Sequence, residues 1–96
     1  MKKEFVITDI LHSGRKGERY TPVQNNKYDG VIGYTAKIDT DSIERGKSLF
    51  MKLPDSPIYE WWNTSMVLAV WENKDDNILT IETENTIYIL KECNDD

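Results

Sequence analysis

Cysteine is almost absent from this chain: Cys93, close to the C-terminus, is the single one. One thiol cannot close an internal disulfide, which is typical of proteins that work in a reducing compartment. No apolar run approaches the roughly 18 residues that cross a bilayer. Glu4, Thr8 and Asp9 interrupt any apolar segment that could serve as a secretion signal. We therefore expect a cytoplasmic protein without a membrane segment.

Side chains that perform catalysis or bind metals are equally scarce. His12 is the single histidine, and adjacency to Ser13 does not by itself create a nucleophile and its base. One histidine and one cysteine do not make a zinc site, and residues 39–44 lack the pattern of a calcium loop. Glu60 lies beside two tryptophans, but a glutamate at a strand edge is the simpler interpretation. The sequence predicts that the protein is not an enzyme and has no cofactor and no metal.

Charge of one sign dominates the chain, but it is unevenly spread. The net charge is −5, from 17 acidic and 12 basic residues. Residues 1–20 have five basic and three acidic side chains, a net charge of +2, whereas residues 72–96 have two and eight, a net charge of −6. Nucleic-acid affinity depends on neutralising phosphates, so this overall charge disfavours nucleic acid as a partner.

One basic cluster nevertheless leaves a nucleic-acid function open. Arg15, Lys16 and Arg19 lie beside Tyr20 in a loop that contains two glycines. Positive charge next to an aromatic ring can bind single-stranded nucleic acid. A solvated hairpin tip is the simpler interpretation. A related alternative is an acidic inhibitor whose surface mimics nucleic acid.

Short stretches of alternating apolar residues are what the chain contains instead. Residues 5–11 are rich in β-branched side chains and predict a strand. Its expected faces are Phe5, Ile7 and Leu11 on one side and Val6 and Ile10 on the other. Residues 31–38 also alternate, and residues 48–53 predict a strand with Leu49, Met51 and Leu53 pointing inward. Residues 12–30 are irregular, and we expect them to be the most mobile section.

Residues 64–91 predict a three-stranded antiparallel meander. Polar residues 73–77 form its first turn, and residues 83–86 form a tighter hairpin with Asn85 at positive φ. Pairing Thr83 with Thr86 and Glu72 with Ile78 gives one core face: Val67, Ala69, Trp71, Leu79, Ile81, Tyr88 and Leu90. The second face is also largely apolar: Met66, Leu68, Val70, Ile78, Ile87 and Ile89. A sheet with one side in water alternates more cleanly, so the N-terminal strand, residues 12–30 or another chain must cover this second face.

These elements predict one all-β domain over residues 1–92, followed by an acidic tail at residues 93–96. About five to seven short strands in 96 residues indicate a small antiparallel β-barrel or a barrel-like roll that ends in the C-terminal three-stranded meander. Closing the sheet would also remove its exposed edges.

The last hairpin has the pattern of a threonine, then Asn-Thr or Asn-Ser, then Tyr-x-Leu. It reads Thr83-Glu84-Asn85-Thr86-Ile87-Tyr88-Ile89-Leu90 and follows a strand that begins Thr64-Ser65-Met66-Val67. This third of the chain resembles the closing hairpins of small bacterial and phage-type β-barrel proteins of unknown function. The resemblance implies a barrel and assigns no site residue.

Aromatic residues give the strongest indication of function. Tyr59, Trp61 and Trp62 follow a proline-rich turn, and adjacent tryptophans in an extended chain point to opposite faces, so that one enters the core and the other is covered by a loop or exposed. Tryptophan and tyrosine supply much of the binding energy at protein interfaces. We therefore predict a protein-interaction module that can self-associate as a homodimer, with nucleic-acid binding through the basic loop as the alternative. The candidate contact residues are Tyr59, Trp61, Trp62, Met66, Leu68, Val70, Ile87 and Ile89.

Overall fold

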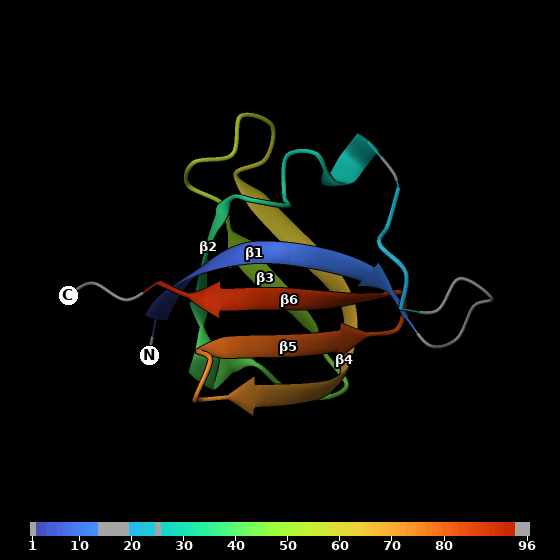
Figure 1. The fold of residues 1–96 in the computed structure, drawn as a ribbon, viewed down its shortest axis with the longest axis vertical. Helices are drawn as coiled ribbons and strands as arrows, with labels where there is room; N and C mark the ends of the chain where they lie inside the picture. The colour runs from blue at the N-terminus through green and yellow to red at the C-terminus, as the bar shows by residue number, and fades with distance from the viewer. Residues whose placement is uncertain (1, 14–19, 25, 94–96) are drawn as a thin grey trace.

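The computed structural model describes residues 2–13, 20–24 and 26–93 and contains six strands that close into a barrel (Figure 1). Each strand pairs antiparallel with the next in the chain, and the last pairs with the first, which confirms the predicted all-β barrel. The strands are β1 (Lys2–His12), β2 (Thr35–Asp39), β3 (Ser48–Lys52), β4 (Trp61–Asn73), β5 (Ile78–Thr83) and β6 (Thr86–Glu92). Two short 3-10 helices, η1 (Asn26–Tyr28) and η2 (Thr40–Ser42), lie in the connections.

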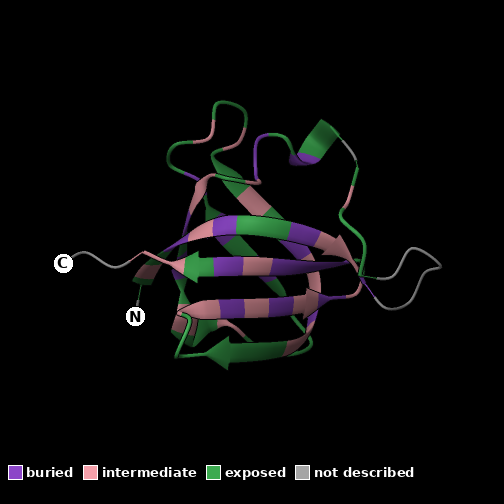
Figure 2. Ribbon diagram, viewed as in Figure 1, coloured by how far each residue is buried: buried purple, intermediate pink, exposed green. Residues whose placement is uncertain are grey.

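The core is formed by the inward positions of all six strands. Leu49, Met51 and Leu53 point inward from and just after β3, as their alternation predicts. Figure 2 shows the same alternation along β5, where buried and half-buried residues succeed each other. The pairing of β5 with β6 also follows the prediction, since Ile81 lies opposite Tyr88 and Leu79 opposite Leu90. The alternation of apolar residues therefore determines the register of this hairpin.

The predicted pairing of β4 with β5 is correct at one end and wrong at the other. Val67 lies opposite Thr83 as expected, but a β-bulge at the next residue shifts the rest by one position. Trp71 consequently lies opposite Thr80 and not opposite Leu79. A bulge adds one residue to one strand, so every following side chain changes face. Trp71 is therefore 53% exposed rather than part of the core, and Ala69 is only partly buried.

A second bulge, at Thr8 in β1, corrects the predicted faces of that strand. Ile7 pairs with Leu90 and Asp9 with Ile89, which leaves Thr8 as the extra residue. Ile10 is in consequence fully buried together with Phe5 and Ile7, whereas Leu11 is half-buried. Strict alternation assigned Ile10 to the opposite face.

The second meander face is mostly covered within this one chain. β1 lies beside β6, with Leu11 opposite Ile87, and Ile87 is buried. Met66, Leu68, Ile78 and Ile89 are partly buried, and Val70 is the exposed member of the set. The bulge in β4 also turns Val70 toward the face of Ile81, its direct partner. The predicted face is therefore not one continuous apolar surface.

The connections contain further corrections. The strand expected at residues 31–38 begins only at Thr35, because residues 29–33 form turns in which Val31 is buried. Asn77, in the turn before β5, has φ 57°, whereas Asn85 is not among the described residues with positive φ. Within residues 12–30, the described part is ordered against β1: Pro22 bridges Leu11, and Val23 N donates to Ile10 O.

Candidate functional site

β4 is longer than either of its neighbours, and this mismatch creates a pocket. Its first half, residues 61–66, pairs with β3, and its second half, residues 67–73, pairs with β5. The edge of the first half that would continue toward β5 instead borders a cavity of about 770 Å³. The end of β1, the segment that follows it, η1, the β5–β6 turn and the start of β6 contribute the rest of the lining. The described lining residues are His12, Thr21, Pro22, Val23, Gln24, Lys27, Tyr28, Trp62, Asn63, Ser65, Asn85, Thr86 and Tyr88.

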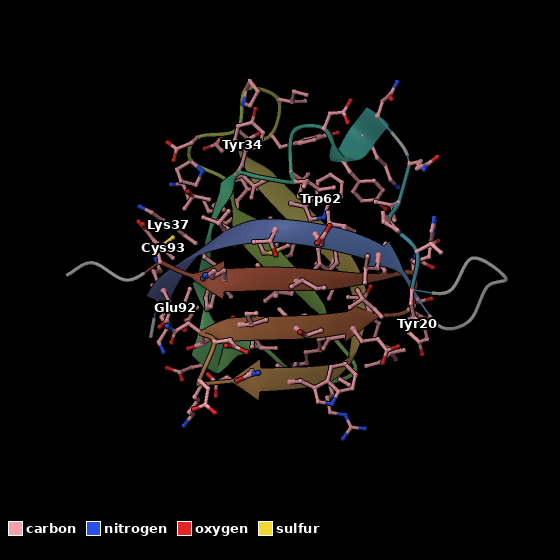
Figure 3. All side chains as sticks on the ribbon, viewed as in Figure 1. Tyr20, Tyr34, Lys37, Trp62, Glu92 and Cys93 are labelled. Atoms are coloured by element: carbon pink, nitrogen blue, oxygen red, sulfur yellow. The ribbon has the colours of Figure 1, made fainter. Side chains whose placement is uncertain are left out.

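Trp62 is the central aromatic residue of the pocket. It lies on β4 opposite Met51 of β3, so its ring points toward the core and is half-buried. The indole Nε1 donates a hydrogen bond to the Tyr88 hydroxyl at 2.9 Å. The rings of Tyr28 and Tyr59 pack against it with centroid distances of 5.6 and 5.0 Å. Figure 3 shows Trp62 beneath η1, which supplies Tyr28. These contacts from three other segments hold the indole in one orientation.

Two of the three tyrosines beside Trp62, Tyr28 and Tyr88, have a raised hydroxyl pKa. Burial raises the pKa of Tyr88 above its ordinary value of 10.0, while hydrogen bonds with Thr86 and Trp62 act in the opposite direction. Burial also raises the pKa of Tyr28. Both hydroxyls are therefore neutral hydrogen-bonding groups in the physiological pH range.

Hydrogen bonds hold the polar rim of the pocket in place. The backbone N–H of Ser13 donates to Asn85 O at 3.1 Å, and the Ser13 hydroxyl donates to Glu84 O at 2.9 Å. The Asn85 backbone N–H donates to the Ser65 hydroxyl at 3.3 Å. The β5–β6 turn is thereby tied both to the end of β1 and to β4. Lys27 lies with its Nζ 5.0 Å from the centroid of the Tyr28 ring.

The charge of the lining differs from that of the whole chain. None of the thirteen lining residues is an aspartate or a glutamate, although the chain contains 17 of them. Lys27 and His12 are the ionisable groups besides the two tyrosines. Within the described lining, the pocket is therefore neutral to positive in a protein whose net charge is −5.

A second candidate surface lies on the outside of the barrel, on β2, β3 and β4. Phe50 and Trp61 are 59% and 54% exposed. They are diagonal neighbours, because Phe50 pairs with Asn63 and Lys52 pairs with Trp61. Lys52 Nζ lies 5.8 Å from the Trp61 ring centroid, and Lys37 lies directly opposite Lys52. We call Phe50, Trp61, Lys37 and Lys52 the outer patch.

The structure distributes the contact residues predicted from sequence over separate parts of the barrel. Tyr59 and Trp62 join the aromatic cluster of the pocket, whereas Trp61 belongs to the outer patch, which identifies Trp62 as the tryptophan that packs against the core. The remaining five contact candidates lie on the meander strands: Met66, Leu68, Val70, Ile87 and Ile89. Of the basic loop, Arg15, Lys16 and Arg19 lie outside the described residues, and Tyr20 is exposed at the barrel end opposite to Lys37 and Glu92 (Figure 3).

Sequence reasoning missed most of the pocket. Lys27, Asn63 and Asn85 lie in no local sequence pattern that indicates a site, and alternation predicts Tyr88 for the core alone. Phe50 is predictable from sequence, because the alternation of residues 48–53 places it on the outer face when Leu49 and Met51 point inward. His12 is half-buried at the end of β1, and Glu60 is exposed.

Within the described ranges, no three histidine, cysteine or acidic side chains lie close enough together to hold a metal ion. The same ranges contain no helix with the length and apolar character to span a membrane. Comparisons with models of protein families, with curated proteins and with solved structures give no match to this chain.

Proposed function

We propose that this protein is a non-catalytic protein-interaction module that binds an extended or loop segment of a partner protein at the outer patch. The observation that supports this function is the pair of aromatic rings, Phe50 and Trp61, that are more than half exposed on a hydrogen-bonded sheet. Tryptophan has only two side-chain torsions, so ordering it at an interface costs little entropy, and tryptophans are frequent energetic centres of interfaces.

The charges around these rings indicate the chemistry of the partner. Lys37 and Lys52 lie directly opposite each other, an arrangement that is unfavourable unless negative charge lies nearby. Glu4 provides part of that charge, since its carboxylate lies 3.5 Å from Lys37 Nζ. Lys52 is exposed over Trp61. An apolar segment flanked by aspartate or glutamate would therefore complement the patch.

The test begins with a photo-reactive amino acid in place of Ser48, which is exposed on β3 two positions from Phe50. Crosslinking in an extract of the source cells identifies the partner, and titration calorimetry with the purified partner measures its dissociation constant. We expect Trp61→Ala to weaken binding about thirtyfold, which corresponds to the roughly 2 kcal/mol of an interface hot spot. Lys52→Glu should weaken it as well, because it reverses the charge beside Trp61.

Trp71→Ala is the matched control, because Trp71 is equally exposed on the same strand but lies opposite Thr80, away from the patch. Sedimentation velocity at several concentrations shows whether the partner is a second copy of this chain. Equal effects of Trp61→Ala and Trp71→Ala would contradict the proposal, as would a monomer that gives no specific crosslink.

A further inference from the structure

We propose that the pocket beside β4 binds a nucleotide, that is, a small ligand with a flat nitrogen heterocycle and at least one phosphate. This site is separate from the outer patch, and its ligand does not depend on the protein-interaction function. The pocket has a volume of about 770 Å³. Its volume lies within the roughly 300–1,000 Å³ of small-molecule sites.

The aromatic part of the ligand would lie against Trp62. The indole is held by the Tyr88 hydroxyl at its Nε1 and by the rings of Tyr28 and Tyr59, so it does not have to be ordered when a ligand arrives. It is half-buried and lines the cavity, which leaves part of its surface open to the pocket. Base–aromatic stacking needs such a fixed flat surface.

Hydrogen-bonding groups around Trp62 suit the edge of a heterocycle. Gln24, Asn63 and Asn85 line the pocket, and each amide side chain has both donors and an acceptor. The first half of β4 adds backbone groups, because no described strand lies beside it on the pocket side. A purely apolar ligand would leave these groups without partners, which makes a polar heterocycle the better fit.

The phosphate is indicated by the charge of the lining. Lys27 places an ammonium group at the pocket, His12 lines it from the end of β1, and no described lining residue carries a carboxylate. Asp29 and Glu84 neighbour lining residues in sequence but do not line the cavity themselves. The net charge of −5 opposes a long phosphate backbone but acts less on a small anion beside a local cation. We therefore infer a mononucleotide and not a nucleic-acid strand.

The experiment titrates the full chain with adenosine, guanosine, cytidine and uridine monophosphates. Binding is followed by calorimetry and by the nuclear magnetic resonance signal of the Trp62 indole N–H, assigned with Trp62→Phe. The matching nucleosides, inorganic phosphate and a short single-stranded oligonucleotide serve as the other arms. We expect at least one mononucleotide to shift the Trp62 signal and to bind about tenfold more tightly than its nucleoside, as one charge-assisted hydrogen bond predicts.

Four variants separate the pocket from the rest of the surface. Lys27→Met should remove the tenfold preference for the mononucleotide, whereas Lys52→Met, which also removes a lysine over an aromatic ring, should retain it. Asn85→Ala changes an exposed side chain and should weaken nucleoside and nucleotide alike. Trp61→Phe should leave binding unchanged.

The proposal fails if no mononucleotide shifts the Trp62 signal at millimolar concentration while the variants remain folded. It also fails if Lys27→Met and Lys52→Met have equal effects, or if only the oligonucleotide binds. None of these results bears on the outer patch, because its test measures partner binding, and Trp61 and Lys52 serve here only as controls.

Discussion

The hydrogen bond from Trp62 to Tyr88 shows how one polar contact sets the conformation of two large aromatic side chains. The Tyr88 hydroxyl is buried, and a buried hydroxyl needs a partner. Trp62 supplies that partner and is oriented in return. At the residue scale, core packing and the shape of the pocket are therefore decided by the same contact.

The buried tyrosine makes folding stability depend on pH at the alkaline end. Burial raises the pKa of Tyr88 above 10.0, so the unfolded chain loses this proton near pH 10 while the folded protein keeps it. Stability is fully present below that pH and falls as the pH rises from there, by up to about 1.4 kcal/mol per pH unit for this group. Urea unfolding between pH 9 and 11, a range around the ordinary tyrosine pKa of about 10, measures how steeply the free energy of unfolding falls with pH. Tyr88→Phe should flatten this dependence, while Tyr20→Phe, at an exposed position, should not.

At the scale of elements, the bulges and tight turns decide which side chains face the core. The bulge between Ser48 and Phe50 is accompanied by a buried hydrogen bond in which the Leu49 backbone N–H donates to the Thr64 hydroxyl at 2.9 Å. The β5–β6 turn uses the same device. Buried threonines thus replace backbone partners where the strand ladder is irregular.

Thr83 allows a direct test of this device. Its hydroxyl accepts from the Thr86 backbone N–H at 3.1 Å and donates to Thr86 O at 2.8 Å, and Thr83 is fully buried. Thr83→Val keeps the volume and removes these two bonds together with the 3.2 Å hydrogen bond between the Thr83 and Thr86 hydroxyls, so we expect a loss of about 1–3 kcal/mol from the free energy of unfolding. Denaturant titration should show a lower midpoint with an unchanged slope. The control Thr80→Val, at a half-buried outward position of β5, should cost less than about 0.5 kcal/mol.

At the scale of the whole molecule, closure of the barrel depends on the two ends of the chain. β1 lies between β2 and β6, and the hydroxyl of Thr8 donates to Ile89 O across 81 positions of sequence. The β5–β6 hairpin, in contrast, is local. Forming the long-range pairs costs loop entropy before any contact is gained, so barrels of this kind fold slowly.

If the local β5–β6 hairpin forms before β1 docks, core residues in the two places should affect the folding rate differently. Ile7 and Ile81 are both fully buried, and truncating either to alanine should cost about 2–5 kcal/mol. Ile7→Ala should act mainly by faster unfolding, because β1 docks late, whereas Ile81→Ala should slow folding. Stopped-flow measurements over a range of urea concentrations separate the two effects. A folding rate that Ile7→Ala lowers as much as Ile81→Ala would show that β1 docks early.

Sequence reasoning was accurate wherever a rule of period two applied without interruption. It identified the barrel class, the inward residues of β3 and the β5–β6 register. It was wrong at Trp71 and Ile10, because each follows a bulge and one extra residue reverses every later face. A bulge depends on how two strands pack against each other, and no local residue pattern at Thr8 or Leu68 predicts one.

The sequence by itself determined that the chain has about five to seven short alternating segments, a net negative charge and too few ligating side chains for a zinc site. These properties are local or compositional. The tertiary structure alone decided that Trp62 faces a pocket and Trp61 faces outward, and that the described pocket lining contains no carboxylate. The pocket is built from segments that are far apart in the chain. The pairing of β4 with one neighbour in each half and the pairing of β1 with β6 bring them together.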